Sequence, residues 1–156
     1  MNTKSYLSGE VDIKKFKKGK RVNKGGFGIV YQVEEKETGV IYAAKIIDCG
    51  DDEQVCNTII EREVGIMTLA KHPTIVKFVG YSKLDFHDEN NVVIIMELAK
   101  NGSLSDVIKS IQESNGPKDY TNTLKQIILV GIARGMKYLH DRGIIHRDLK
   151  TGNVLL

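Results

Sequence analysis

The pattern of the sequence changes near residue 101, and this change limits most strongly the folds that the chain can adopt. Before it, β-branched and aromatic residues partly alternate with polar residues in short runs separated by turn residues, which predicts β-strands. The predicted strands cover residues 11–23, 28–36, 40–48, 76–84 and 91–98. After residue 101 the pattern becomes helical, so the sequence predicts an α+β fold.

Three helices are predicted, one among the strands and two after them. Residues 51–70 have three acidic residues at their front, which suit a helix N-terminus, and apolar residues at a spacing of about 3.6. Residues 103–112 form the second helix, with Ser103 as its N-cap, and residues 122–140 form the third. The third is apolar on most of its faces, so we expect it to be buried on several sides.

The composition excludes several classes of protein. The 156 residues are 41% hydrophobic and 28% charged, with 15 glycines and 2 prolines, which is ordinary for a soluble globular domain and unlike a disordered or collagen-like chain. The longest apolar run, residues 127–133, is too short to span a membrane, and the N-terminus has no apolar stretch. We therefore expect a cytoplasmic protein with no membrane segment, and the nucleus is the alternative location.

The two cysteines, Cys49 and Cys56, have neither C-x-x-C spacing nor histidines paired with them as metal ligands. The sequence therefore suggests neither a zinc site nor a disulfide framework. This use of cysteine fits a reducing compartment.

Most of the net charge of +3 comes from residues 14–21, where six of the eight residues are lysine or arginine. Such a run can bind nucleic acid or anionic lipid, or act in nuclear import. It can also be the solvent-facing side of a strand, where lysines protect an edge from pairing with other chains. Because the run is short and contains one aromatic residue, Phe16, we favour the strand and expect no nucleic-acid partner.

Three glycines, Gly25, Gly26 and Gly28, lie between the first two predicted strands. A glycine hairpin lets backbone N–H groups approach an anion closely, and Phe27 could cover the phosphates of a nucleotide. The same glycines are also ordinary in a hairpin turn. No P-loop is present, and a strand rather than a helix follows the glycines, which excludes the dinucleotide-binding fingerprint.

Lys45 lies on a predicted strand 17 residues after Gly28, and Glu63 lies 18 residues further on in the first predicted helix. A lysine in an apolar strand needs a compensating charge if it is buried, and a carboxylate on a neighbouring helix could both pair with it and aim it at phosphates. Each residue could instead be an ordinary surface charge. Glu61 is the rival partner, since residues two apart on a helix face different ways.

The run HRDLKTGN, residues 146–153, matches the catalytic loop of protein kinases. The earlier motifs follow the order and spacing of the same family, so residues 11–156 resemble the first part of a kinase domain. The resemblance implies a small lobe with a five-stranded antiparallel sheet and one helix, followed by the start of a helical large lobe. It divides the chain into a leader at 1–10, the small lobe at 11–97, and a hinge with an incomplete large lobe at 98–156.

By this similarity the chain would bind ATP and Mg²⁺. Lys45 would hold the α- and β-phosphates of ATP and pair with Glu63. The other nucleotide contacts that the resemblance implies are the phosphate loop of Asn23, Gly25, Gly26, Phe27 and Gly28, the adenine-covering Val30, Ala43 and Leu155, the gatekeeper Met96, the hinge residues Glu97, Leu98 and Ala99, and the ribose contact Ser103.

The catalytic groups would come from the same loop. Asp148 would accept or orient the proton of the substrate hydroxyl, and the amide oxygen of Asn153 would bind Mg²⁺. Lys150 would neutralise charge on the transferred phosphoryl group, and a lysine there resembles enzymes that phosphorylate serine and threonine in proteins. Residues 96–108 and 132–150 look most like the tyrosine-kinase-like group.

The sequence departs from the family pattern in two places. Asn23 stands where the family has its first loop glycine, and Asn tolerates the left-handed backbone region better than other side chains. No D-F-G follows the catalytic loop within the 156 residues, so we expect the chain alone to be inactive. The alternatives are a short pseudokinase-like nucleotide-binding or regulatory module and a non-functional fragment. The sequence does not indicate an oligomeric state.

Overall fold

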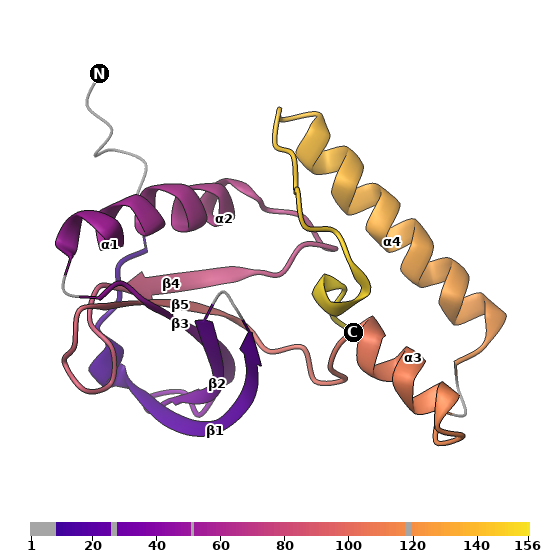
Figure 1. Cartoon of the computed structure of the whole chain (residues 1–156), viewed down its shortest axis with the longest axis horizontal. Helices are drawn as coiled ribbons and strands as arrows, with labels where there is room; N and C mark the ends of the chain where they lie inside the picture. The colour runs from indigo at the N-terminus through magenta and orange to yellow at the C-terminus, as the bar shows by residue number, and fades with distance from the viewer. Residues whose placement is uncertain (1–8, 26–27, 51, 118–119) are drawn as a thin grey trace. The chain divides into compact units, whose positions relative to one another are not determined.

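The computed structural model of the chain describes residues 9–25, 28–50, 52–117 and 120–156 (Figure 1). The chain divides into two compact units. The first unit comprises Met1–Lys71 and Lys77–Leu98, and the second comprises His72–Val76 and Ala99–Leu156.

The first unit is built on a five-stranded antiparallel sheet, which confirms the predicted fold class. The strand order is β1-β2-β3-β5-β4. The strands are β1 (Phe16–Gly25), β2 (Gly28–Glu35), β3 (Ile41–Asp48), β4 (Phe78–Ser82) and β5 (Asn91–Glu97). Val92, Val93, Ile94 and Ile95 of β5 are all fully buried, because this strand lies inside the sheet and both of its faces are covered.

The first strand begins later than the sequence predicts. Ile13–Lys15 form a 3₁₀ turn, and the Asp12 carboxylate caps it by accepting a hydrogen bond of 2.9 Å from the Lys14 amide. Ile13 and Phe16 are buried in the core on one face of the sheet. β1 is an edge strand and most of its residues are exposed, as the edge-strand interpretation of the lysine-rich run predicts.

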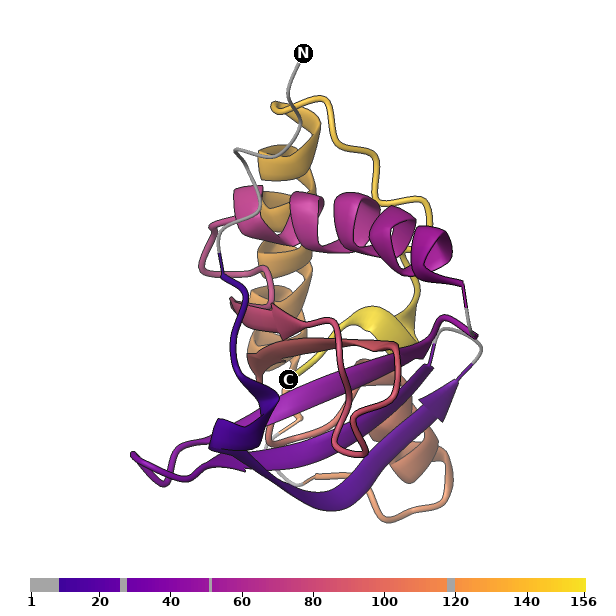
Figure 2. The same cartoon turned by 90° about the vertical axis from the view of Figure 1, so that its left-hand side faces the viewer.

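A helical segment lies across the other face of the sheet, as Figure 2 shows. It consists of α1 (Glu53–Ile59), a π-helical turn at Ile60–Val64 and α2 (Gly65–Leu69). Ile60 and Val64 are buried in a core that also contains residues of β4 and β5. The sequence predicts a regular helix here. The π turn, which contains Glu63, differs from this prediction.

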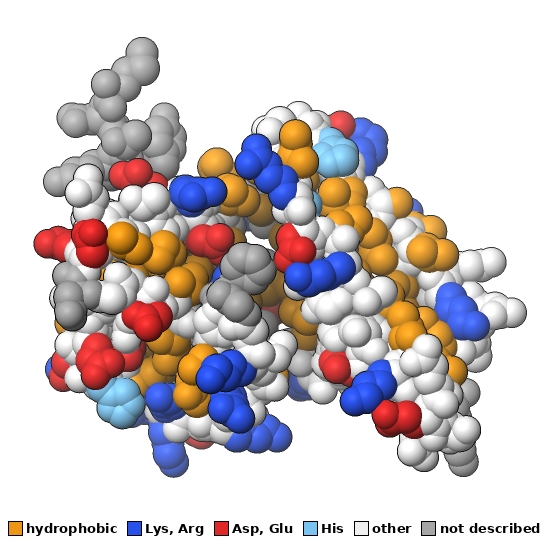
Figure 3. Space-filling model, in the orientation of Figure 1, with side chains coloured by type: hydrophobic (Ala, Val, Ile, Leu, Met, Phe, Trp, Pro, Cys, Tyr) orange, Lys and Arg blue, Asp and Glu red, His pale blue; other side chains and the backbone are white. Residues whose placement is uncertain are grey.

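The second unit contains the helices α3 (Leu104–Gln112) and α4 (Asn122–His140) and a 3₁₀ turn at Thr151–Asn153. The bounds of α4 are those that the sequence predicts. The predicted burial of α4 is not observed. Ile127, Leu129 and Val130 are about half exposed or more, and hydrophobic side chains gather on the visible surface of α4 in Figure 3. Among the described residues, no helix has the length and hydropathy needed to cross a membrane.

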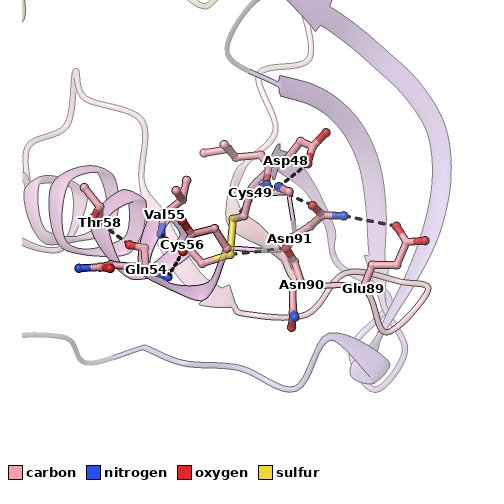
Figure 4. The surroundings of a disulfide bond; sticks show 12 residues. Asp48, Cys49, Gln54, Val55, Cys56, Thr58, Glu89, Asn90 and Asn91 are labelled. Atoms are coloured by element: carbon pink, nitrogen blue, oxygen red, sulfur yellow. Dashed lines mark hydrogen bonds between the residues drawn. A yellow bond between two sulfur atoms is a disulfide. The ribbon is translucent and has the colours of Figure 1, made fainter.

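Cys49 and Cys56 form a disulfide, which corrects the expectation drawn from their spacing (Figure 4). Cys49 follows β3 directly, and Cys56 lies in α1. The chain reverses between the two elements and brings their Cα atoms to 5.3 Å, within the range that a disulfide bridges. This reversal is a property of the fold that no cysteine motif reveals. Both residues are buried in the core beneath the helical segment.

Candidate functional site

The glycine-rich segment is a hairpin turn in the sheet. Gly25 ends β1 and pairs with Gly28, which begins β2. Gly26 and Phe27 lie outside the described residues. Gly28 has a φ of +123°, and a Cβ there would lie 2.2 Å from the carbonyl oxygen of Ile46. A glycine is therefore required at residue 28 by the fold itself.

Gly25 is different, because the fold gives no reason for a glycine there. Its φ is outside the left-handed region, and an added Cβ would have no heavy atom of the described residues within 4 Å. No atom of the described residues fills the place beside the Gly25 backbone that a side chain would take. A ligand that approaches the backbone closely would explain the absence of a side chain.

Asn23 lies in β1 and pairs with Val30. Its side-chain oxygen accepts a hydrogen bond of 2.7 Å from the amide of Lys24. Among the described residues, the non-glycine positions with positive φ are Asp88, Ser114 and Arg147. The tolerance of Asn for the left-handed region is therefore not used at residue 23, and this part of the reasoning from sequence is corrected.

Lys45 and Glu63 form an ion pair, with 3.2 Å between Nζ and Oε2. Lys45 comes from the interior strand β3, and its side chain is 22% exposed, whereas that of Glu63 is 49% exposed. The structure thus selects Glu63 over Glu61 as this partner of Lys45. An ion pair with one half-exposed member contributes only about 0–1 kcal/mol to folding, so the main effect of the pair is to position the ammonium group.

The sheet places three apolar side chains on the same face as Lys45. Val30 pairs with Lys45 across β2 and β3, and Ala43 lies two residues before Lys45 on β3. Ala43 in turn pairs with Met96 of β5. Because side chains of directly paired residues and of every second residue point to one face, the positions assigned to adenine contact share the face of Lys45.

The hinge residues begin at Glu97, the last residue of β5. The Glu97 amide donates a hydrogen bond of 2.9 Å to the Lys77 carbonyl oxygen, and the Glu97 carboxylate accepts one of 2.7 Å from the Lys77 amide. These two bonds fix the first hinge residue to the segment before β4. Leu98 is the last residue of the first unit, and Ala99 begins the next segment of the second.

The second unit brings Asp148, Lys150 and Asn153 together. Lys150 Nζ lies 2.9 Å from Asp148 Oδ2, and Asn153 Nδ2 donates hydrogen bonds to Asp148 Oδ2 and to the Asp148 carbonyl oxygen at 2.8 and 2.7 Å. The hydrogen bond from Lys150, followed by that from Asn153, lowers the pKa of Asp148 below its ordinary value. Asp148 is therefore ionised at neutral pH. Arg147, the residue before it, has a φ of 60°, a sparsely populated backbone conformation for a side chain of this kind.

Hard oxygen donors are present for a magnesium ion. They are the Asp148 carboxylate and the amide oxygen of Asn153, whose Nδ2 is the atom bonded to Asp148. The described part of the chain has no cluster of three or more His, Cys, Asp or Glu side chains that could enclose a metal. Mg²⁺ in phosphoryl-transfer sites is commonly held by one or two protein groups together with substrate phosphates, and this donor set fits that mode of binding.

Ser103 lies beside Leu155, because residues 101–104 pair with residues 154–156 in the second unit. Ser103 is buried and is the N-cap of α3. Its Oγ donates to Asp106 Oδ2 at 2.7 Å and accepts from the Asp106 amide at 3.2 Å. The sequence analysis did not identify Asp106 as the partner of Ser103, although the S-x-x-D spacing of a capping box predicts it. The assigned ribose contact of Ser103 remains a prediction.

Replacing Ser103 by alanine should destabilise α3 by about 0.5–2 kcal/mol, because the cap of the Asp106 amide is lost. Ser103→Thr keeps the hydroxyl and is the matched control. Hydrogen exchange of residues 104–112 measures the effect. Equal exchange in the alanine variant and the wild type would contradict the capping role.

The cap also has a pH dependence with a defined sign. Hydrogen bonds from the Ser103 side chain and backbone lower the pKa of Asp106 below its ordinary value of 3.8. The folded form thus binds the proton more weakly than the unfolded form, so this contribution to stability is present above about pH 4 and is lost as the pH falls through the lower folded value.

Comparison with known proteins assigns the chain to a family. The model of the family described as protein kinase domain matches residues 16–156. The chain is 36% identical over 155 residues to an Aurora kinase of Candida glabrata, covering 98% of this chain and 40% of that protein. It is 34% identical over 145 residues to an Aurora kinase of Saccharomyces cerevisiae, covering 90% and 36%, and 32% identical over 148 residues to the serine/threonine-protein kinase DCLK2 of Homo sapiens, covering 92% and 17%. The chain spans two fifths or less of the length of these relatives. With its Lys45–Glu63 pair and its Asp148 cluster, the chain belongs to the protein kinase domain family.

Proposed function

We propose that the protein is an ATP-dependent kinase domain that transfers the γ-phosphate of ATP to serine or threonine hydroxyls of proteins in signalling. The Lys45–Glu63 pair is the main support for the proposal, because it holds the Lys45 ammonium group at a fixed position. This position is on the sheet face that also carries Val30, Ala43 and Met96. A fixed ammonium group beside apolar side chains suits a ligand that has both phosphates and a flat apolar ring.

The phosphates would lie under the glycine turn. Their oxygens would meet Lys45 Nζ and the backbone near Gly25, where a Cβ would meet no atom of the described residues. The adenine ring would contact Val30 and Ala43 of the sheet, and the adenine contact of Leu155 stays a prediction from the family resemblance. Met96 and the hinge residues Glu97, Leu98 and Ala99 would limit the depth of the adenine site and bind its edge.

Asp148 would orient the attacking hydroxyl. A carboxylate whose pKa is lowered is a weak base, so it does not remove the proton before the new bond forms. It does accept a hydrogen bond from the substrate hydroxyl and can take the proton as the P–O bond develops. Magnesium, when bound by Asn153 and the phosphates, supplies positive charge that neutralises the phosphates. Lys150, which pairs with Asp148, supplies a further positive charge.

The choice of serine and threonine rests on Lys150 and on the relatives, whose printed names include serine/threonine-protein kinases. The finer placement in the tyrosine-kinase-like group rests on residues 96–108 and 132–150 alone. We also propose a cytoplasmic location, with the nucleus as the alternative.

Nucleotide binding tests the proposal. Titration of a fluorescent ATP analogue should show saturable, Mg²⁺-dependent binding that unlabelled ATP reverses. Lys45→Met should weaken it by about 1.5–3 kcal/mol, or about 10- to 150-fold, because a charge-assisted contact to phosphate is lost. Glu63→Gln should weaken it by less, since Lys45 itself remains.

The matched control is Lys17→Met, which removes an exposed lysine of β1 and makes the same change in charge. It should leave the affinity within about twofold of the wild type. Equal affinities of Lys45→Met and the wild type would refute the assignment of the phosphate site. Equal losses in the two lysine variants would show a general effect of net charge instead.

A further inference from the structure

The disulfide joins the end of β3, the strand that carries Lys45, to α1, the helix that leads into the π turn with Glu63. Cys49 lies four residues after Lys45, and Cys56 lies seven residues, about two helical turns, before Glu63. We propose that Cys49 and Cys56 are a reversible thiol–disulfide site for small thiols of the glutathione class, and that its oxidation state controls how firmly Glu63 is held beside Lys45. The proposal rests on the proposed function insofar as the ion pair binds the nucleotide.

The strand end of the bond is fixed and the helix end is weakly held. The Cys49 amide donates a hydrogen bond of 3.4 Å to Asn91 Oδ1 on the neighbouring strand β5. At the other end, residues 53–55, 57 and 58 of α1 are exposed, and Cys56 is the one buried residue of that helix. The covalent bond at Cys56 is therefore the main tether of α1 to the strand, with Ile59 packed against the same core.

The tether reaches Glu63 through a continuous helical segment. Cys56, Ile60 and Val64 recur four residues apart and are buried in one core together with Cys49. Glu63 lies next to Val64, in the π turn. A shift of α1 away from the sheet would carry this turn with it and lengthen the distance of 3.2 Å between the carboxylate and Lys45.

The fold accommodates the reduced form as well. Cys56 Sγ lies 3.5 Å from the carbonyl oxygen of Asn90, and Cys49 Sγ lies 3.7 Å from that of Ile47 (Figure 4). Disulfide sulfurs carry no hydrogen, so these two acceptors serve an S–H donor only after reduction. Reduction thus buries no unsatisfied donor. A bond whose two states both fit the core can switch without unfolding the unit.

The exchange balances with a small disulfide as the oxidant. One cysteine thiolate attacks a sulfur of the small disulfide and releases a small thiolate, which takes up the proton that the cysteine lost. The second cysteine thiolate then attacks the mixed disulfide and releases the second small thiol. Two protein thiols are oxidised by two electrons, and one small disulfide is reduced to two thiols. In the reducing compartment that the sequence predicts, protein disulfides are usually of this transient, redox-sensing kind.

Access is restricted but available. Cys49 and Cys56 are each 5% exposed, whereas their neighbours Gly50, Asp52 and Asn90 are exposed. A small thiol can therefore react with the disulfide only when this surface opens locally. We expect thiol–disulfide exchange to be slower than for a free peptide.

The first experiment follows the bond and the helix without nucleotide. The chain is equilibrated in glutathione buffers of increasing ratio of disulfide to thiol, and differential alkylation with mass spectrometry measures the oxidised fraction. Hydrogen exchange of residues 53–64 is then compared in the two forms. We expect a reversible transition and about tenfold faster exchange in the reduced form, because the tether is lost. Residues 104–112 of α3, in the other unit, should not change.

The control is the double variant Cys49→Ser/Cys56→Ser, whose exchange should be the same in both buffers. Failure of the disulfide to form reversibly, or equal exchange of residues 53–64 in its two forms, would overturn the proposal.

The second experiment measures the affinity for the Mg²⁺-ATP analogue in both forms. The oxidised chain should bind about three- to tenfold more tightly, and Lys45→Met should abolish this difference. Equal affinity in the two forms would overturn the link to the ion pair. Absence of binding in both forms would refute the proposed function, and the exchange experiment would still decide whether the bond holds the helix.

Discussion

Gly28→Ala is expected to unfold the sheet of the first unit. The new Cβ would lie 2.2 Å from the carbonyl oxygen of Ile46, and both atoms are attached to backbone that is held in the ladder between β2 and β3. The left-handed φ of +123° adds strain for any residue with a Cβ. Together we expect a loss of about 4 kcal/mol or more, close to the whole stability of a marginal domain. Denaturant unfolding followed by circular dichroism measures it.

Gly25→Ala is the matched control in the same turn. Its Cβ would meet no heavy atom of the described residues within 4 Å, and its φ is not left-handed, so the stability should stay within about 1 kcal/mol of the wild type. The affinity for the ATP analogue should fall, because the methyl group occupies the space assigned to the phosphates. A Gly28→Ala protein as stable as the wild type would contradict the packing of β2 on β3. Unchanged nucleotide affinity in Gly25→Ala would contradict the position of the phosphates.

The sequence predicts the regular elements well because their signals are local. Alternation of apolar residues locates β2, β3, β4 and β5 to within a few residues, and the bounds of α4 are those predicted. The first strand is the exception. The sequence shows the same alternation through residues 11–15, but Asp12 caps a 3₁₀ turn there, and a local side-chain hydrogen bond overrides the strand pattern.

Features that depend on the path of the chain are not predicted. Cys49 and Cys56 meet because the end of β3 and the helix α1 lie side by side, with 5.3 Å between the two Cα atoms, and a spacing of seven residues does not encode this. The exposure of Ile127 and Leu129 likewise depends on which segments pack against α4. A hydrophobic pattern shows which side chains favour burial. It does not show what covers them.

The features of the candidate site divide in the same way, into those that the sequence predicts and those that it does not. A helix partner for Lys45 follows from the residues, and the choice of Glu63 follows from the family resemblance, in agreement with the ion pair of the structure. The π turn around Glu63 has no signal in the sequence, because the buried Cys56, Ile60 and Val64 keep the spacing of four residues that a regular helix also has. For Ser103, the resemblance gives a ligand contact and the structure gives a helix cap, and both interpretations remain testable.

Asp148→Asn should reduce phosphoryl transfer by about 10²- to 10⁴-fold, the usual contribution of a positioned acid or base. Asparagine keeps the size and one oxygen of aspartate, so it retains an acceptor for Asn153 Nδ2, but it has no charge for Lys150 and cannot take the hydroxyl proton. The ground-state affinity for the ATP analogue should therefore change little while the rate falls. This separation distinguishes a catalytic role from a structural one.

The rate is measured as transfer of labelled γ-phosphate to a serine- and threonine-containing peptide library, in the longest natural protein that contains this chain. Asp141→Asn is the matched control, since Asp141 is an exposed aspartate that also pairs with a lysine, Lys137, at the end of α4. It should transfer phosphate at the rate of the wild type. Equal rates for Asp148→Asn and Asp141→Asn would refute the catalytic assignment. Saturable nucleotide binding with no transfer by the wild type would instead favour the nucleotide-binding module. The ionised Asp148 beside Lys150 argues for the enzyme, because a module that only binds ATP has no chemical use for it.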